Sequence, residues 1–322
     1  MKKIINSVFF ALMVINASAQ HQCALGKMNK VIGHPVISST YTDLENKYDV
    51  HFQHLNVNLE ITDKNISGNT RTISTVLTST LDTFAFELYN SLVIDSVILN
   101  GKKITPVRVQ NIVNVLISPV LNSGNTIDAT VYYHGTPPTI NGPNVGDGLN
   151  NASSQTWGNQ VTWTLSEPYS AYEWFPSKQQ LQDKLDSVYV FVTTDSANKA
   201  GSNGNLTRIV NLGNKKRFEW KEKHPIDYYL VSVTVAQFVD YSIYAHPVGY
   251  PDSVLIQNYI YNNPATLTNY KPTIDQTKTL VELFSGLYGM YPFADEKYGH
   301  CMAPFGGGME HQTMTSLGSF SM

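Results

Sequence analysis

Charged residues are scarce in this chain. Asp, Glu, Lys and Arg make up only 15% of its 322 residues, whereas about 25% is usual in a soluble domain. The 22 basic and 25 acidic residues leave a formal net charge of −3, so the sequence has neither a basic footprint for nucleic acid nor a long acidic tail. We therefore expect no nucleic-acid partner, and a surface hydrated mainly by Asn, Gln, Ser, Thr and Tyr.

A hydrophobic run long enough to span a membrane is also missing. The main apolar run, residues 4–15, is shorter than the ~20 residues that cross a bilayer. It follows two lysines and precedes Ala17-Ser18-Ala19, which is the order found in a secretory signal. We predict a signal peptide over residues 1–19 that is removed before Gln20, with an uncleaved membrane anchor as the alternative. The mature chain is then secreted or periplasmic and keeps no stable membrane segment.

Cysteine is nearly absent, with Cys23 and Cys301 at opposite ends of the mature chain. An exported compartment permits a disulfide between them, but their spacing does not show whether they pair. A lipid anchor on Cys23 is a weaker alternative. Neither cysteine has the neighbouring residues of a catalytic or metal-binding thiol, so two unpaired cysteines are the default expectation.

Strand-forming patterns fill the first two thirds of the chain. Hydrophobic residues at Leu55, Val57 and Leu59 alternate with polar ones, which is typical of a half-buried strand, and Asn100-Gly101 is a two-residue hairpin signal. We predict a saddle-shaped antiparallel β-sandwich domain over residues 20–240. Further strand-like runs lie at 70–77, 83–88, 93–99, 104–109, 112–117, 126–133, 159–165, 188–193, 208–212, 217–220 and 229–235.

The pattern changes after Pro251. Hydrophobic residues fall at helical spacing from Ile274 to Leu287, and Gly289 with Pro292 is expected to end the helix. A second, helix-containing domain is therefore predicted over residues 251–322. About seventy residues are too few for a comfortable core of their own.

A glycine run near the end of the chain is the most distinctive local feature. Glycine has no Cβ, so its backbone can lie flat against another extended chain. Glu310 then places a carboxylate where it can accept hydrogen bonds from the ammonium group of a peptide. A glycine-rich turn that leads into an edge strand is the alternative, and the glycines by themselves favour it. The segment reads Gly306, Gly307, Gly308, Met309, Glu310 and His311.

This segment resembles the G-x-M-E-N exopeptidase motif of the aminopeptidase N-type zinc metallopeptidases, a gluzincin family. Residues 307–311 match four of the five positions, with His311 in place of Asn, and the preceding Tyr-Pro-Phe and Lys-Tyr occur at about the spacing of the family. A weaker match at residues 164–168 looks like the segment in which Glu167 helps to bind the substrate amino group.

The resemblance implies a fold, a substrate class and a cofactor. It implies a saddle-shaped β domain followed by the start of an α+β thermolysin-like catalytic domain, and peptide substrates with a free amino terminus. It also implies zinc held by H-E-x-x-H and a later Glu, with the first Glu as general base for a zinc-bound water. The amino-terminus site is then expected at Glu310, Glu167 and the residues around Gly308.

None of the nine histidines is followed by Glu-x-x-His. In the family the zinc helix comes shortly after the glycine motif, whereas this sequence reaches Met322 first. We therefore expect this chain to hold no metal, to lack the catalytic residues of the longer parent and to be inactive alone. His300 and His311 bracket the glycines and are expected to shape that loop. The competing function is a non-catalytic secreted β-sandwich that binds peptide or glycan.

Overall fold

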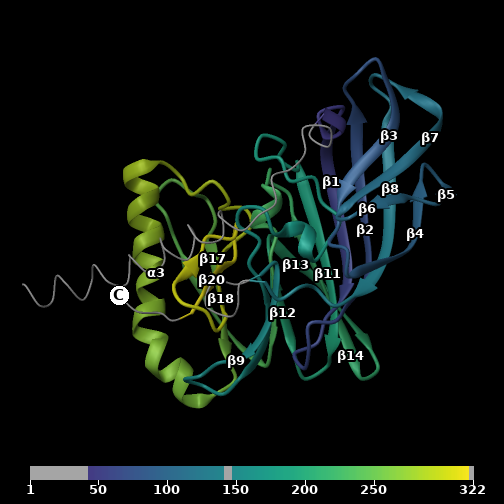
Figure 1. Cartoon of the computed structure of the whole chain (residues 1–322). Coiled ribbons are helices and arrows are strands. Elements are labelled where there is room, and N and C mark those ends of the chain that lie inside the picture. Colours follow the sequence, from purple (N-terminus) through teal and green to yellow (C-terminus); the bar gives the residue numbers. More distant parts are fainter. Residues whose placement is uncertain (1–42, 141–146, 319–322) are drawn as a thin grey trace, which may run out of the picture.

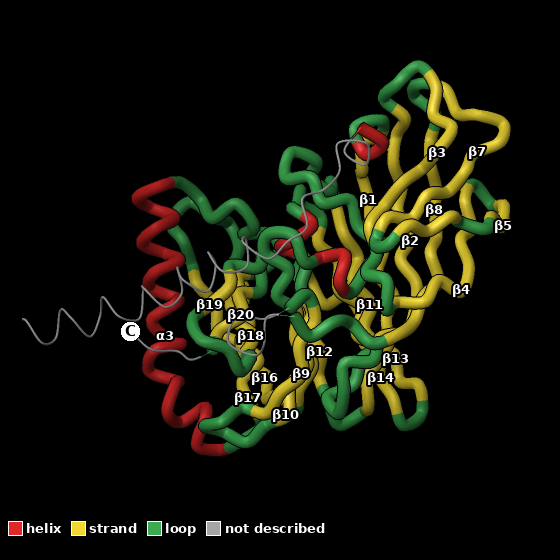
Figure 2. The backbone as a smooth tube through the Cα atoms, in the orientation of Figure 1, coloured by secondary structure: helices red, strands yellow, loops and turns green. Residues whose placement is uncertain are grey.

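The computed structural model describes residues 43–140 and 147–318. Figure 1 shows helix α3 (Pro264–Tyr288) and the five-stranded sheet on one side of the molecule, and the eight-stranded and three-stranded sheets on the other. Figure 2 shows the strands of a smaller sheet between these two parts. The predicted signal peptide and Cys23 lie outside the described residues.

The largest sheet has eight strands and contains the alternating segment singled out in the sequence. Leu55 and Val57 are buried on its inner face, as the alternation predicts. Strands β1 and β11 pair in parallel, whereas every other neighbouring pair is antiparallel. In spatial order the strands are β13 (Asn205–Leu212), β14 (Lys215–Glu222), β11 (Ser187–Asp195), β1 (Tyr48–Asn58), β2 (Ile66–Val76), β8 (Thr126–Gly135), β4 (Leu92–Leu99) and β5 (Lys102–Ile104).

A three-stranded sheet of β3 (Thr80–Glu87), β7 (Ile112–Asn122) and β6 (Val107–Val109) packs against the inner face of the large sheet. Tyr48 and Phe84 meet across this interface with ring centroids 5.0 Å apart. Both residues of the Asn100-Gly101 turn have positive φ angles, which confirms the hairpin between β4 and β5. The prediction of a single strand over residues 104–109 is wrong, because this stretch contains the end of β5 and the whole of β6, which belong to different sheets.

The third sheet has four strands, β12 (Lys199–Ser202), β15 (Val233–Ala236), β10 (Gln160–Thr164) and β9 (Leu149–Ser153). A short 3₁₀ turn, η1 (Ala171–Glu173), follows β10. A second one, η2 (Tyr228–Leu230), precedes β15. The strand expected at residues 229–235 therefore begins at Val233.

The fourth sheet carries the glycine run. Its strands, in spatial order, are β16 (Phe238–Ala245), β17 (Val254–Tyr261), β18 (Tyr298–Met302), β20 (Thr315–Leu317) and β19 (Gly308–Met309). Helix α3 (Pro264–Tyr288) connects the parallel strands β17 and β18, and its buried residues include Ile274 and Val281. The helix ends before Gly289, as predicted, but it begins ten residues before Ile274.

One hydrophobic core joins the two predicted domains. Tyr259, Met302 and Met314 from the last part of the chain belong to the same buried cluster as Trp163 and Trp220. The short carboxyl-terminal segment therefore shares a core with the sandwich, which removes the difficulty of its small size.

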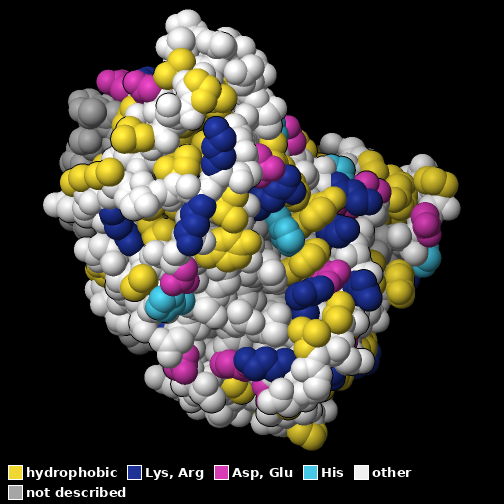
Figure 3. Space-filling model, turned by 90° about the vertical axis from the view of Figure 1, so that its right-hand side faces the viewer, with side chains coloured by type: hydrophobic (Ala, Val, Ile, Leu, Met, Phe, Trp, Pro, Cys, Tyr) yellow, Lys and Arg dark blue, Asp and Glu magenta, His cyan; other side chains and the backbone are white. Residues whose placement is uncertain are grey.

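The surface reflects the composition. On the face in Figure 3, Lys and Arg side chains are interspersed with Asp, Glu and hydrophobic side chains, and no broad patch carries one charge. Among residues 43–140 and 147–318, no helix has both the length and the apolar composition needed to cross a membrane.

Candidate functional site

The glycine run forms a turn that leads into an edge strand. Gly306 and Gly307 are exposed, and Gly307 has a φ of 93°, a conformation that favours glycine. Gly308 lies opposite Leu317 in the ladder between β19 and β20. A Cβ on Gly308 would lie 2.8 Å from the Leu317 Cδ2. We call residues Phe305–Glu310 the glycine loop.

Strand β19 lies at one end of its sheet. It pairs with β20 on one side, and in the described part of the chain no strand pairs with its other side. An extended peptide can add to such an edge through backbone hydrogen bonds. The two interpretations of the glycine run, a turn into an edge strand and a binding track for a peptide, therefore share this geometry. They differ only in whether a peptide binds.

The side chains around β19 divide between the interior and the solvent. Met309 and His311 are buried, whereas Glu310 is exposed at the end of the strand. The His311 Nδ1 lies 2.9 Å from the Ser316 Oγ, and Ser316 pairs with Met309. His311 thus ties the turn after Glu310 to the returning strand β20.

Glu167 follows β10, far from Glu310 in the sequence, and it is half-buried. The next carbonyl, that of Pro168, accepts a hydrogen bond from the Tyr228 hydroxyl at 2.5 Å. At the end of η2, the Asn203 amide donates to the carbonyls of Leu230 at 3.0 Å and Gln312 at 2.6 Å. The Glu167 segment therefore contacts η2 directly, and the segment after Glu310 is linked to η2 through Asn203.

A buried lysine beneath this region was not identified as a site residue from the sequence. The Lys297 ammonium donates to the carbonyls of Ser202, at 3.0 Å, and Gly204. It also lies 3.4 Å from the Thr313 Oγ1 and 4.8 Å from the centroid of the Trp220 ring. Lys297 thus connects the start of β18 to the β12–β13 turn.

Two buried carboxyl groups lie near this lysine. Glu222 accepts a hydrogen bond from the Thr313 hydroxyl at 3.0 Å, and Glu296 accepts one from the Lys223 backbone at 2.8 Å. Burial lowers the pKa of Lys297 to about 7, and burial, followed by the nearby Glu222, raises the pKa of Glu296 to about 8. We call Lys297, Glu222, Glu296 and Thr313 the Lys297 junction.

Thr313 shows what this junction does for the glycine loop. Its φ is 60°, an uncommon conformation for a β-branched residue. Its hydroxyl accepts a hydrogen bond from the Gly204 backbone at 2.7 Å while donating to Glu222. These contacts hold the turn that follows Glu310 against the first domain, and so fix where the loop lies.

His300 and Cys301 lie buried on β18. The His300 Nδ1 lies 2.7 Å from the Asn258 Oδ1, and burial lowers the pKa of His300 to about 4, so the ring is neutral at neutral pH. Burial raises the pKa of the Cys301 thiol to about 12, and Cys301 forms no disulfide with a described residue. Neither side chain has the properties of a nucleophile or a proton donor at neutral pH.

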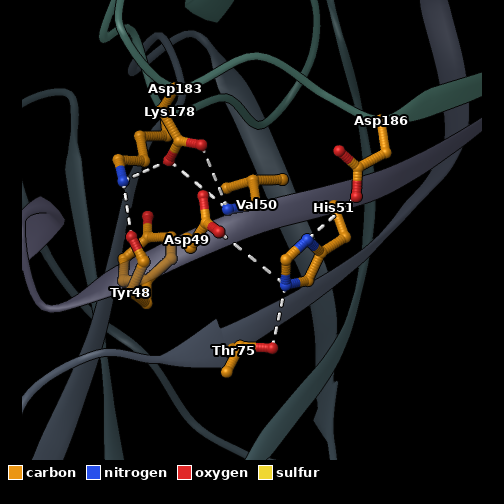
Figure 4. A network of polar contacts seen from close by, with 8 residues as sticks. All are labelled: Tyr48, Asp49, Val50, His51, Thr75, Lys178, Asp183 and Asp186. Atoms are coloured by element: carbon orange, nitrogen blue, oxygen red, sulfur yellow. Dashed lines mark hydrogen bonds and ion pairs between the residues drawn. The ribbon is translucent and has the colours of Figure 1, made fainter. Parts of the chain in front are cut away.

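A second network supports β1, as Figure 4 shows. The buried Lys178 ammonium donates to the Tyr48 carbonyl at 2.6 Å and to Asp183, and Asp183 accepts from the Val50 backbone. Beside it, His51 contacts Asp186 at 3.0 Å. These contacts fix the start of the central strand and have no connection to the glycine loop.

A zinc site does not fit the residues that the structure describes. Within residues 43–140 and 147–318, no group of three His, Cys, Asp or Glu side chains is placed to hold a metal ion.

A scan against protein-family models and a search of curated proteins find no match. Solved structures do match. The M1 zinc metallopeptidase from Deinococcus radiodurans is 20% identical, with a TM-score of 0.72, over 85% of this chain and 61% of that one. A variant of it bound to a Tyr-Ser-Ala substrate has a TM-score of 0.71 at 20% identity, over 84% and 60%. Native yeast LTA4 hydrolase has a TM-score of 0.63 at 17% identity, over 84% and 40%.

The chain spans about 60% of the length of the Deinococcus enzyme and 40% of the yeast enzyme. At these identities the likeness concerns the fold. It confirms the predicted mainly β architecture and agrees with the expected amino-terminal portion of the aminopeptidase N-type, or M1, zinc metallopeptidases. The chain thus has the fold that these metallopeptidases share over the matched region.

Proposed function

We propose that this chain is the amino-terminal, substrate-binding part of a secreted M1 metalloaminopeptidase. The observation that carries the proposal is the glycine run at the edge of the sheet, with Gly306 and Gly307 exposed before the buried Met309 of β19 and Glu310 exposed directly after it. Residues 20–240 supply the β domain, and the segment from 251 onward begins the catalytic domain. The zinc centre that cleaves the first peptide bond belongs to the longer parent.

Substrate binding follows from this geometry. A peptide pairs its backbone with the glycines at positions 306 to 308, where the absence of side chains leaves room for close approach. Its ammonium group lies at the end of the strand, and Glu310 accepts charge-assisted hydrogen bonds from it. Glu167 supplies the second carboxylate. A peptide chain that continues past this position has no free ammonium group there and is excluded. The site therefore selects peptides whose first residue lies next to Glu310, as an exopeptidase requires.

Substitution of Glu310 tests this role without turnover. Glu310→Gln is expected to weaken binding of the tripeptide Tyr-Ser-Ala by about 10- to 100-fold, because a hydrogen bond to a charged group contributes about 1.5 to 3 kcal/mol. Glu310→Asp keeps the charge and is expected to weaken binding less. Isothermal titration calorimetry of the mature chain measures both.

Two controls accompany this experiment. Asp82→Asn removes an exposed carboxylate on β3 and should leave the affinity unchanged. The amino-acetylated tripeptide has no ammonium and should bind the native chain as weakly as the free tripeptide binds Glu310→Gln. Equal affinities for the acetylated and free peptides would show that Glu310 does not recognise the amino terminus.

The described residues include no group of side chains placed to hold a metal ion, and this allows a prediction about the zinc content of the chain. The purified mature chain is expected to contain well below one zinc per molecule and to hydrolyse no aminoacyl-anilide substrate. Elemental analysis after dialysis against buffer with micromolar zinc measures the first quantity, and a chromogenic assay measures the second. One tightly held zinc with chelator-sensitive turnover would contradict the assignment of catalysis to the longer parent.

A further inference from the structure

The β9–β10 turn faces the start of α3 at one end of the molecule (Figures 1 and 2). Residues of these two segments line two adjoining hollows. One has a volume of about 490 Å³ and the other about 660 Å³, within the 300–1,000 Å³ typical of small-ligand sites. Trp157 and Pro264 line both hollows. We call the two together the Trp157 groove. The glycine loop contributes no residue to it.

The lining of the groove is uncharged and combines polar with apolar side chains. None of its lining residues is Asp, Glu, Lys, Arg or His, and besides the side-chain amides it includes the hydroxyls of Thr156 and Thr268. An amide side chain both donates and accepts hydrogen bonds, and a hydroxyl does the same. Such a wall offers no counter-charge to an ionic ligand and suits a ligand with many hydroxyl groups. The amides are Asn159, Gln160, Gln237, Asn262, Asn263 and Asn269.

Trp157 supplies an aromatic surface at the centre of the groove. It is half-buried, and its ring meets Tyr270 edge to face with centroids 5.8 Å apart. The other three tryptophans, Trp163, Trp174 and Trp220, are completely buried. Trp157 is thus the tryptophan whose side chain a ligand can reach.

The turn that presents Trp157 is held in place by its own hydrogen bonds. The Gly158 backbone donates to the Ser154 carbonyl at 2.7 Å, and the Ser154 backbone donates to the Asn159 carbonyl at 2.8 Å. The Trp157 backbone donates to the Ser154 hydroxyl at 3.2 Å. The aromatic surface is therefore fixed before a ligand arrives, which lowers the entropic cost of binding.

We propose that the Trp157 groove binds a neutral oligosaccharide. The apolar face of a sugar ring packs on Trp157, since an indole ring offers a large flat apolar surface, and the exposed amides of Gln237, Asn262 and Asn269 exchange hydrogen bonds with the sugar hydroxyls. A peptide fits less well, because recognition of an extended backbone uses a strand edge or a charged terminus. The groove offers mainly side chains of a turn and a helix start, without charge.

Tryptophan fluorescence and calorimetry test this proposal with three defined probes: maltohexaose, cellohexaose and N-acetylchitohexaose. At least one is expected to change the fluorescence of the native chain in a saturable way. Trp157→Ala should abolish that signal and weaken binding about tenfold or more by calorimetry, as for other aromatic anchors. Asn262→Ala, at an exposed lining residue, should weaken it less, and Trp157→Phe should retain part of the affinity.

Tyr288→Ala is the matched control. Tyr288 is 82% exposed at the far end of α3, the helix whose start lines the groove, and it lies outside the groove. This variant should bind the sugar normally. Circular dichroism checks that each variant is folded, and Glu310→Gln should leave sugar binding unchanged, which separates this site from the proposed peptide site. Binding of none of the three sugars, equal affinity for the native chain and Trp157→Ala, or binding of uncharged blocked peptides in place of sugars would overturn the proposal.

Discussion

Lys297→Met is expected to lower the free energy of unfolding by about 3 kcal/mol at pH 7, because it removes the centre of a buried polar network. The carbonyls of Ser202 and Gly204 lose their shared donor, and Glu222 and Glu296 lose the nearby ammonium group. Methionine fills a similar volume, so the loss reports mainly on these polar contacts. Urea unfolding followed by circular dichroism measures it.

Lys278→Met is the control for this variant. Lys278 lies on α3 with a half-exposed side chain, and its ion pair with Glu282 is 4.0 Å long, so its removal should change stability by less than about 0.5 kcal/mol. Lys297→Arg is not expected to rescue the site, because the larger guanidinium must fit a completely buried position. Stability of Lys297→Met close to that of the native chain would mean that the junction contributes little.

Lys297→Met is also expected to have a local effect near the Lys297 junction. Because Thr313 holds the turn after Glu310 against the first domain, loss of Lys297 should loosen that turn as well as the whole fold. Amide hydrogen exchange in residues 311–317 should therefore accelerate more than exchange in β2. Equal acceleration in both segments would assign Lys297 a global role only.

Local patterns were enough to identify most of the strands. The alternation in β1 and the turn at Asn100-Gly101 depend on neighbouring residues, and the structure has both. Strands β9, β12, β16, β17, β18 and β20 were not predicted. Of these, β9 and β12 are short and carry no clear alternation, and their pairing partners β10 and β15 define them. The split between β5 and β6 was missed because the same run of residues serves two sheets.

The sequence likewise predicted one part of the candidate site and missed another. The glycine loop was found because glycine and Glu310 are adjacent in the sequence, and their exposure follows from their place at a sheet edge. Lys297 was missed as a buried group because a lysine between Glu296 and Tyr298 resembles an ordinary surface residue. Its partners Ser202 and Gly204 lie more than ninety residues away, and local sequence carries no signal for such contacts. The Trp157 groove was missed for the same reason.

Glu87→Gln is expected to stabilise the protein at pH 8 and to have little effect near pH 4.5. Glu87 is buried at the end of β3, and burial raises its pKa from 4.5 to about 8, with the nearby Glu45 adding to the increase. Its carboxyl group accepts a hydrogen bond from the Gln179 amide at 2.6 Å. Gln at position 87 is neutral at every pH, has a similar volume and keeps an acceptor for Gln179.

The sign of the pH dependence follows from proton binding. Below pH 4.5, Glu87 is protonated in both the folded and the unfolded chain, so its ionisation costs nothing. Between pH 4.5 and 8, the unfolded chain releases the proton while the folded chain retains it, and stability falls as the pH rises. Each unit of pH in this window removes up to about 1.4 kcal/mol.

The advantage of Glu87→Gln over the native chain should therefore grow through this window and level off above pH 8, at about 2 to 4 kcal/mol. Urea unfolding of both proteins at pH 5, 6.5 and 8 measures the difference directly. Glu282→Gln, which alters a more exposed carboxylate on α3, should give a difference that changes little with pH. A Glu87→Gln difference that stays constant or shrinks from pH 5 to pH 8 would mean that Glu87 ionises normally in the folded protein, and that water or a cation reaches the end of β3.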